Sequence, residues 1–311
     1  MSEPASLRSA FGALKRFFFA PQDTLACDVV RIGYAGVLLC MSLLAWPQAR
    51  VWFGETGALP YEISRSVAGS PGWTVFTLLP HTDLTAYVCL ALLILQAGLL
   101  LLGVWSRFQA VCLYGWLLSF HNRNPLILDS EDALLRVLGF LVIWMPLGHT
   151  LSLGAWRRGR LASLVERPVW ALRLLQIETC LVFAGSALSK LQSDDWVDGT
   201  AMYYVSRLDD LFGRFPTPAF VWESLFWMKL LTWAVIAIEA AVPVLVWFRE
   251  TRWFALAAAV LMHLGIDYTM NLFAFHWIML VAWSSFVRGE DWRALAARLR
   301  GSKNVGSDRS D

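Results

Sequence analysis

A lysine closes one of the long apolar runs of this chain and is followed at once by a loop rich in aspartate. Lys190 is the last residue of the run 169–190, and the next residues read LQSDDWVDG. Such a lysine either extends its ammonium group into the lipid headgroups or pairs with a nearby carboxylate. If it is buried without a partner, the neutral amine is favoured and can take a proton from a substrate. The residue types around Lys190 therefore suit general-base chemistry.

A second group of polar residues connects two shorter apolar runs. It comprises His121, Arg123, Asn124, Asp132 and Arg136. Asp132 and Arg136 are four residues apart, so they can pair on one face of a helix. One interpretation is that this pair is satisfied inside the bundle and orients two helices. The other is that the group forms the polar floor of a cavity, with His121 as a proton-transfer candidate.

Two later apolar runs also carry ionisable residues. Glu239 lies near the middle of one run, where it needs a partner or a proton, and Pro243 leaves a backbone carbonyl free nearby. His263 and Asp267 are spaced i and i+4, so they face the same way on a helix. A carboxylate that orients an imidazole makes an acid/base pair, and it also makes an ordinary buried hydrogen bond. The spacing leaves both interpretations open.

The sequence lacks the motifs of several well-known enzyme classes. It contains no HExxH, no P-loop, no G-x-S-x-G and no two histidines spaced i and i+4. We therefore expect no metal site. The net charge of +2, without a basic patch interleaved with aromatic residues, also argues against a nucleic-acid partner.

The composition indicates an integral membrane protein. Apolar residues make up 57% of the 311 residues and charged residues only 16%, and this apolar share exceeds that of an ordinary soluble domain. We predict an all-α polytopic bundle of about eight transmembrane spans. No internal repeat of the kind common in transporters is evident. The predicted spans are residues 28–46, 83–104, 107–122, 132–147, 169–190, 225–248, 253–270 and 271–288.

Charge in the connecting segments predicts the orientation of these spans. Lys and Arg gather before the first span, between the fourth and fifth, between the sixth and seventh, and after the last. Because such clusters favour the cytoplasmic side, both termini are expected there, and the loops 47–82, 123–131 and 191–224 face the periplasm. The expected parts are an amphipathic interfacial segment (1–20), the transmembrane domain (21–290) and a polar cytoplasmic tail (291–311).

Several segments resemble the transmembrane part of the vitamin K-dependent gamma-carboxylases. They are even more similar to the bacterial stand-alone relatives known as HTTM (horizontally transferred transmembrane) domain proteins. The main segment is SALSKLQSDDWVDGTAMYYVSR, which contains Lys190. The resemblance extends over residues 20–290. Further matching segments, in chain order, are RIGYAGVLL, FGETGALP, HNRNPLILDSEDALLRVLGFLVIWMPLG, WAVIAIEAAVPVLV and MHLGIDYTMNLFAFHWIMLV.

The resemblance implies quinone chemistry. In the carboxylases the lysine is regarded as the base that deprotonates reduced vitamin K, which implies Lys190 as the catalytic base here. His263 matches a family histidine, and His121 is a further catalytic candidate. Trp196 and Gly199 are expected to frame the pocket over Lys190. The remaining candidate quinone-binding residues are Arg123, Asn124, Asp132, Arg136, Asp195, Tyr203, Glu239 and Asp267.

The implied activity is oxygenation or epoxidation of a reduced vitamin K or menaquinone-type quinone, alone or coupled to carboxylation of a peptide glutamate. The alternative is a non-catalytic membrane scaffold, or a maturation or assembly factor, whose polar residues join helices. A lipid- or substrate-translocating bundle ranks lower, because transporters usually contain repeats. We expect membrane lipid around the chain, quinone and peptide as candidate partners, and a periplasm-facing site in the bacterial inner membrane.

Overall fold

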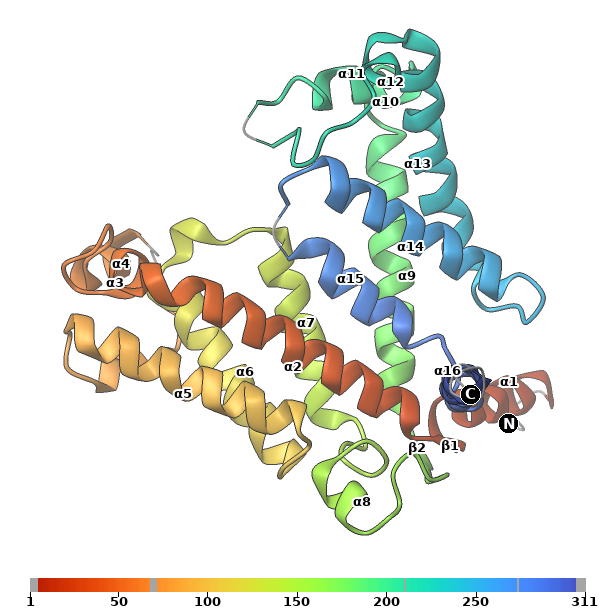
Figure 1. Cartoon of the computed structure of the whole chain (residues 1–311), viewed down its shortest axis with the longest axis horizontal. Coiled ribbons are helices and arrows are strands. Elements are labelled where there is room, and N and C mark those ends of the chain that lie inside the picture. The colour runs from red at the N-terminus through yellow and green to blue at the C-terminus, as the bar shows by residue number, and fades with distance from the viewer. Residues whose placement is uncertain (1–4, 68–71, 210, 273, 306–311) are drawn as a thin grey trace, which may run out of the picture. The chain divides into compact units, whose positions relative to one another are not determined.

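The computed structural model describes residues 5–67, 72–209, 211–272 and 274–305, and these are mostly helical (Figure 1). Among them, the named strands are β1 (Pro21–Asp23) and β2 (Glu166–Pro168), which pair in antiparallel fashion. This confirms the predicted all-α class. The chain divides into two compact units, one made of Met1–Leu174 with Val287–Asp311 and the other of Leu175–Phe286.

The first unit, called unit 1 below, is built on a four-helix bundle. In this bundle α2 packs on α5, α5 on α6, α6 on α7, and α7 again on α2. Gly139 of α7 has no side chain, and this leaves room for the buried hydroxyl of Tyr34 on α2. The helices of unit 1 are α1 (Ala5–Phe19), α2 (Leu25–Ala45), α3 (Ala49–Phe53), α4 (Tyr61–Val67), α5 (Asp83–Leu101), α6 (Ser106–Arg123), α7 (Ser130–Trp144), α8 (Leu153–Arg157) and α16 (Gly289–Val305), with short 3-10 turns at Trp46–Gln48, Val75–Leu78 and Pro125–Ile127.

The second unit, called unit 2 below, is organised around the long helix α9 (Trp170–Lys190), most of which belongs to it. Helix α14 packs on both α13 and α15, and the short helices α10, α11 and α12 pack on α13. In Figure 1, α9 and α13 are the two long green and teal helices of this unit. The remaining helices are α10 (Asp194–Val197), α11 (Ala201–Val205), α12 (Ala219–Glu223), α13 (Leu225–Leu245), α14 (Arg252–Thr269) and α15 (Phe275–Ser284).

Four of the described helical segments are long and apolar enough to cross a membrane, so the predicted count of about eight is not confirmed. The helices α7 and α15 have 15 and 10 residues, and at 1.5 Å per residue they reach only about 23 and 15 Å of the ~30 Å hydrocarbon layer. The helices α6 and α14 are longer, but polar side chains dilute their apolar character. The four segments are Leu25–Phe53, Asp83–Leu101, Trp170–Lys190 and Leu225–Leu245.

The terminal segments are largely helical. Helix α1 exposes Phe11 and Leu14, which suits the predicted interfacial segment, although residues 1–4 lie outside the described part. Most of the predicted polar tail is the helix α16, and residues 306–311 again lie outside the described part. Arg293 of α16 forms an ion pair with Asp23 of β1 and donates a hydrogen bond to the Ala162 carbonyl, so α16 is tied to unit 1.

Candidate functional site

The centre of the candidate site is an ion pair between Lys190, the last residue of α9, and Glu239 of α13. The Nζ atom lies 2.9 Å from Oε1 and 2.8 Å from Oε2 of Glu239. Both side chains are largely buried, with exposed fractions of 18% for Lys190 and 9% for Glu239. Glu239 thus has the partner that a buried carboxylate needs, and it neutralises Lys190 in place of the aspartates that follow in the sequence.

Two further residues surround the Lys190 ammonium group. Ser186, one turn earlier on α9, accepts a hydrogen bond from Nζ at 2.6 Å. The ring of Trp196 lies over the ammonium group, with 4.9 Å between Nζ and the ring centroid, which is a cation–π distance. An ammonium group has three N–H donors, and the two Glu239 oxygens and Ser186 take all three. The Glu239 carboxylate keeps unused lone pairs, so the open hydrogen-bonding capacity of the pair is on Glu239.

The loop after Lys190 is fixed to α13 through Gly199. This glycine is buried and has a φ of +79°, and a Cβ there would lie 3.0 Å from both Lys229 and Trp233. The Trp233 indole donates to the Val197 carbonyl at 3.0 Å. Because Gly199 permits this close approach, it holds the loop that carries Trp196, which suits the expected framing role.

Two other candidate residues that follow Lys190, Asp195 and Tyr203, contact residues other than Lys190 and Glu239. Asp195 is exposed, and its backbone carbonyl accepts from the amide and hydroxyl of Thr200. Tyr203 stacks under Arg207, with 3.5 Å from the guanidinium carbon to the ring centroid. The described contacts therefore give both residues roles in the loop's own structure.

His263 and Asp267 each have a partner other than the one their spacing predicts. The Nδ1 atoms of His263 and His276 are 3.4 Å apart, and both rings are buried. Asp267 instead forms an ion pair with Arg214 at 2.5 Å, and Arg214 also donates to the Asp267 carbonyl. Near the end of α14, the Asp267 side chain thus meets the loop before α12.

The histidine pair adjoins the same face of α9 as Lys190. Phe183 of α9 contacts the His263 ring, with 5.6 Å between centroids. Residues seven apart on a helix share a face, so Phe183 and Lys190 are aligned, roughly 10 Å apart along the axis. Nδ1 of one imidazole must donate to Nδ1 of the other, which leaves one Nε2 with a proton and the other without. Neither Nε2 has a hydrogen-bond partner among the described residues.

In unit 1, His121 joins Asp132 and Arg136. Its Nε2 lies 3.0 Å from Asp132, and the Arg136 Nε donates to its Nδ1 at 2.8 Å. Asp132 also closes a capping box with Asp129, the N-cap residue of α7. The hydrogen bonds assign the ring proton to Nε2. Since both nitrogens are occupied, this geometry fits a structural link between α6 and α7 better than a free proton acceptor.

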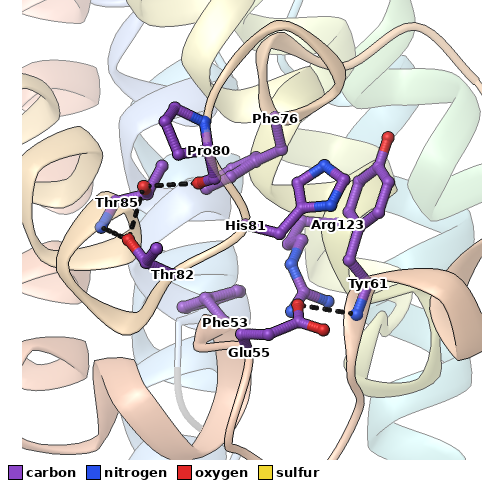
Figure 2. A pocket seen from close by; sticks show the side chains of 9 residues that line it. All are labelled: Phe53, Glu55, Tyr61, Phe76, Pro80, His81, Thr82, Thr85 and Arg123. Carbon is purple, nitrogen blue, oxygen red and sulfur yellow. Dashed lines mark hydrogen bonds between the residues drawn. The ribbon is translucent and has the colours of Figure 1, made fainter.

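The neighbouring residues Arg123 and Asn124 are buried and bind the backbone of the segment 52–59. Arg123 donates to the carbonyls of Leu59 and Gly54, at 2.8 and 2.9 Å, and Asn124 donates to the Trp52 carbonyl at 2.9 Å. Figure 2 shows Arg123 beside Glu55 in a small pocket that Tyr61 and His81 also line. Of the predicted site residues, five thus lie in unit 1 and eight in unit 2.

Sequence reasoning missed three polar residues in unit 2. Ser186 carries no distinctive signal, because a serine four residues before a lysine is common in helices. His276 and Arg214 contact residues far from them along the chain, and such contacts have no local sequence signal. In the described part of the chain, no group of three or more His, Cys, Asp or Glu side chains is arranged to hold a metal ion.

Comparison with known proteins places this architecture in a family. The sequence model of the HTTM domain matches residues 64–292. Two proteins of Bacillus subtilis are similar, each at 23% identity: the sporulation-delaying protein SdpB, over 67% of this chain, and the uncharacterized protein YitO, over 63%. The matches cover 66% and 64% of those proteins, slightly less than two thirds. No solved structure matches significantly. Since the domain match covers most of the sequence, the chain is a membrane protein that belongs to the HTTM domain family.

Proposed function

We propose that this protein binds a reduced quinone beside Lys190 and Glu239 and moves protons between the quinol and this ion pair. The observation that carries the proposal is the largely buried ion pair beneath the Trp196 ring. Paired acid and base side chains inside a helical bundle are typical of proton-transfer sites in membranes. Membership of the HTTM family, and with it the assignment as a membrane protein, does not depend on this proposal.

The residues present fit a quinol in the chemistry of their donors and acceptors. Glu239 has lone pairs that can accept a phenolic proton, and Trp196 offers a flat aromatic surface. When bound, a reduced quinone of the vitamin K or menaquinone type supplies the electrons that reduce O2, giving one quinone epoxide and one water for each quinol and O2.

Within the pair, the two residues have distinct roles. A paired ammonium group has no lone pair, so Lys190 can act as a base only after it loses a proton. Glu239 is the group able to accept a proton first, and Lys190 holds its carboxylate in place through both oxygens. The Ser186 hydroxyl keeps Nζ oriented during this exchange.

A turnover assay tests this proposal. Purified protein in lipid nanodiscs is supplied with reduced menaquinone and O2, and epoxide is measured by mass spectrometry. We expect epoxide from the wild type and a loss of roughly a hundredfold or more in Lys190→Ala and Glu239→Gln, because general acid–base groups contribute about 10²–10⁴-fold. Lys229→Ala is the control, since Lys229 also lies by a tryptophan ring, that of Trp233. No epoxide from the wild type, or equal epoxide from Lys190→Ala, would reject the proposal.

A second candidate function is a non-catalytic scaffold or a maturation or assembly factor. It is favoured by the saturation of the Lys190 donors, which makes the pair a complete link between α9 and α13. One of the similar proteins is named for delaying sporulation, and that name refers to no quinone chemistry. In this case Lys190→Ala lowers stability or the recovery of a partner protein, and no quinone is consumed.

We further propose that the site faces the periplasm of the bacterial inner membrane, with both termini cytoplasmic. Helix α9 supports this orientation, because a cluster of four arginines (Arg157, Arg158, Arg160 and Arg167) precedes it, whereas Lys190 at its other end is neutralised by Glu239. A peptide glutamate would then be carboxylated on the periplasmic side, if carboxylation is coupled to epoxidation. Labelling of single cysteines placed beside Arg167 and Asp195 with a membrane-impermeant reagent tests this orientation. We expect labelling from the periplasm only near Asp195, and the reverse pattern would reject it.

A further inference from the structure

A cavity of about 430 Å³ opens in unit 1 directly after the membrane-spanning helix α5 ends at Leu101. One wall is the turn 103–106, and the other is the segment 147–158, which contains α8. Arg157 and Arg158 are part of its lining. A second cavity, of about 420 Å³, shares Arg158 and is also lined by Arg160. The position after a membrane span places these arginines at the depth of lipid headgroups.

A buried ion pair at the start of α2 holds both walls of the cavity. Asp28 and Arg31 are fully buried and lie 3.0 Å apart. Asp28 accepts hydrogen bonds from the backbone amides of Gly148, Thr150 and Leu151. Arg31 donates to the backbone carbonyls of Leu100 and Leu101, at the end of α5 just before one wall, and to that of Leu151 in the other wall. Burying two charges is unfavourable unless they are paired and hydrogen-bonded, as they are here, so the walls are fixed relative to each other.

Two glycines bring the walls close together. Gly103 and Gly148 have φ values of +72° and +74°, in the region that other residues rarely adopt. A Cβ at Gly103 would lie 2.5 Å from the Ser152 Cβ, and one at Gly148 would lie 2.7 Å from the Ser106 Oγ. The Ser106 hydroxyl is buried, lines the cavity and has no hydrogen-bond partner among the described residues. It is available to donate to a ligand in the cavity.

The charge at the cavity is positive and is not balanced locally. Within the described part of the chain, no carboxylate lies at ion-pair distance from Arg157, Arg158 or Arg160. Gly154, whose missing side chain leaves space 3.3 Å from a terminal nitrogen of Arg158, lets this guanidinium group lie against α8. A guanidinium group binds phosphate oxygens through paired hydrogen bonds, so the cavity suits a phosphate group.

Apolar side chains beside the cavity distinguish a lipid from a soluble anion. Trp105 has an exposed fraction of 78% and is held outward by a left-handed backbone conformation with a φ of +47°. Trp156, Leu102 and Phe108 are also strongly exposed around the same end of the unit. Exposed tryptophans gather at the membrane–water interface, where one end of the ring is apolar and the other is wet. Acyl chains would cover these side chains, which free phosphate would leave bare.

We propose that this cavity binds the phosphate headgroup of an anionic phospholipid, with Arg157 and Arg158 on the phosphate oxygens and Ser106 as a further donor. Basic pockets beside transmembrane helices are suited to such headgroups. The site lies wholly in unit 1, and it does not depend on the proposed quinone chemistry.

Lipid binding by the full chain tests the proposal. Detergent-purified protein is titrated with phosphatidylglycerol or phosphatidylcholine, and the bound lipid is counted by native mass spectrometry. We expect the wild type to prefer phosphatidylglycerol, and R157Q/R158Q to lose roughly tenfold or more of its affinity, since each basic residue near a membrane surface contributes about a factor of five. The control R249Q/R288Q removes the same charge elsewhere and should retain the preference.

In the lipid titrations, any of three results would overturn the proposal: no preference in the wild type, unchanged affinity in R157Q/R158Q, or an equal loss of affinity in the control. Inorganic phosphate is the competing ligand. If it displaces phosphatidylglycerol at millimolar concentrations, the site binds a soluble anion and the lipid assignment is wrong. If the double variant fails to fold, the lipid preference of the wild type and that of Ser106→Ala still test the proposal. Loss of the preference for phosphatidylglycerol in Ser106→Ala supports the site.

Discussion

The Lys190–Glu239 pair can be tested by removing its charges one at a time and then together. Glu239→Leu leaves the ammonium group largely buried with only Ser186 and the Trp196 ring beside it. Lys190→Met leaves the carboxylate without its partner. The double variant Lys190→Met/Glu239→Leu removes both charges and keeps much of the apolar volume. These three variants and the wild type form a double-mutant cycle.

The geometry sets the expected magnitude. At 2.8 Å and an effective dielectric constant of ~20, the attraction is about 6 kcal/mol before desolvation is subtracted. Breaking a buried pair from one side usually costs about 3–5 kcal/mol, whereas replacing both partners is often neutral. Because Lys190 keeps two other contacts, we expect Glu239→Leu to lower the free energy of unfolding by about 3 kcal/mol. For the double variant we expect about 1 kcal/mol or less.

Unfolding in mixed micelles by increasing sodium dodecyl sulfate, followed by circular dichroism, gives the free energies for this cycle. The losses in unfolding free energy of the two single variants should together exceed that of the double variant by at least about 2 kcal/mol. Lys229→Met is the matched control, because Lys229 lies 5.9 Å from the centroid of Trp233 and makes no ion pair among the described residues. We expect it to lose less than about 1 kcal/mol. Additive single losses would refute the ion pair as an energetic unit.

Three further predictions concern neighbouring features. Gly199→Ala should lower the free energy of unfolding by about 1–3 kcal/mol, because φ is +79° and the new Cβ meets Trp233; unchanged stability in the same titration would contradict this. His121→Ala should cost about 1–3 kcal/mol, because it leaves Asp132 and Arg136 without their shared partner, and a neutral effect would count against the link. Nitrogen-15 NMR of the His263–His276 pair should show Nδ1 protonated on one ring and bare on the other, and His276→Phe should abolish the asymmetry; two equivalent rings in the wild type would exclude the pairing.

Local spacing predicted some contacts and missed others for a physical reason. A carboxylate in the middle of an apolar run must find a partner, so the need of Glu239 for one was readable. The identity of that partner was not, because Lys190 lies 49 residues away along the chain and the two side chains meet only in the folded unit. His263 and Asp267 do lie one turn apart on the same helix, α14, as their i, i+4 spacing predicts. Tertiary contacts with His276 and Arg214 then supplied closer partners.

The fold class was easier to predict than the number of spans. Composition and apolar periodicity identified α2, α5, α9 and α13 near their observed positions. Helices α7 and α15 were also located, but they are too short to cross a membrane by length alone. The i, i+3 spacing of Asp28 and Arg31 is compatible with a local pair, but the backbone groups that they bind belong to distant turns, which have no local sequence signal.

The most direct test of the quinone site is a structure of the wild-type protein in nanodiscs with a reduced menaquinone analogue bound. We predict density for the ring within hydrogen-bonding distance of the Glu239 carboxylate and against Trp196, with an isoprenoid tail leading to the lipid. Density for the ligand elsewhere, with Lys190, Glu239 and Ser186 still fully paired to one another, would contradict the proposed site.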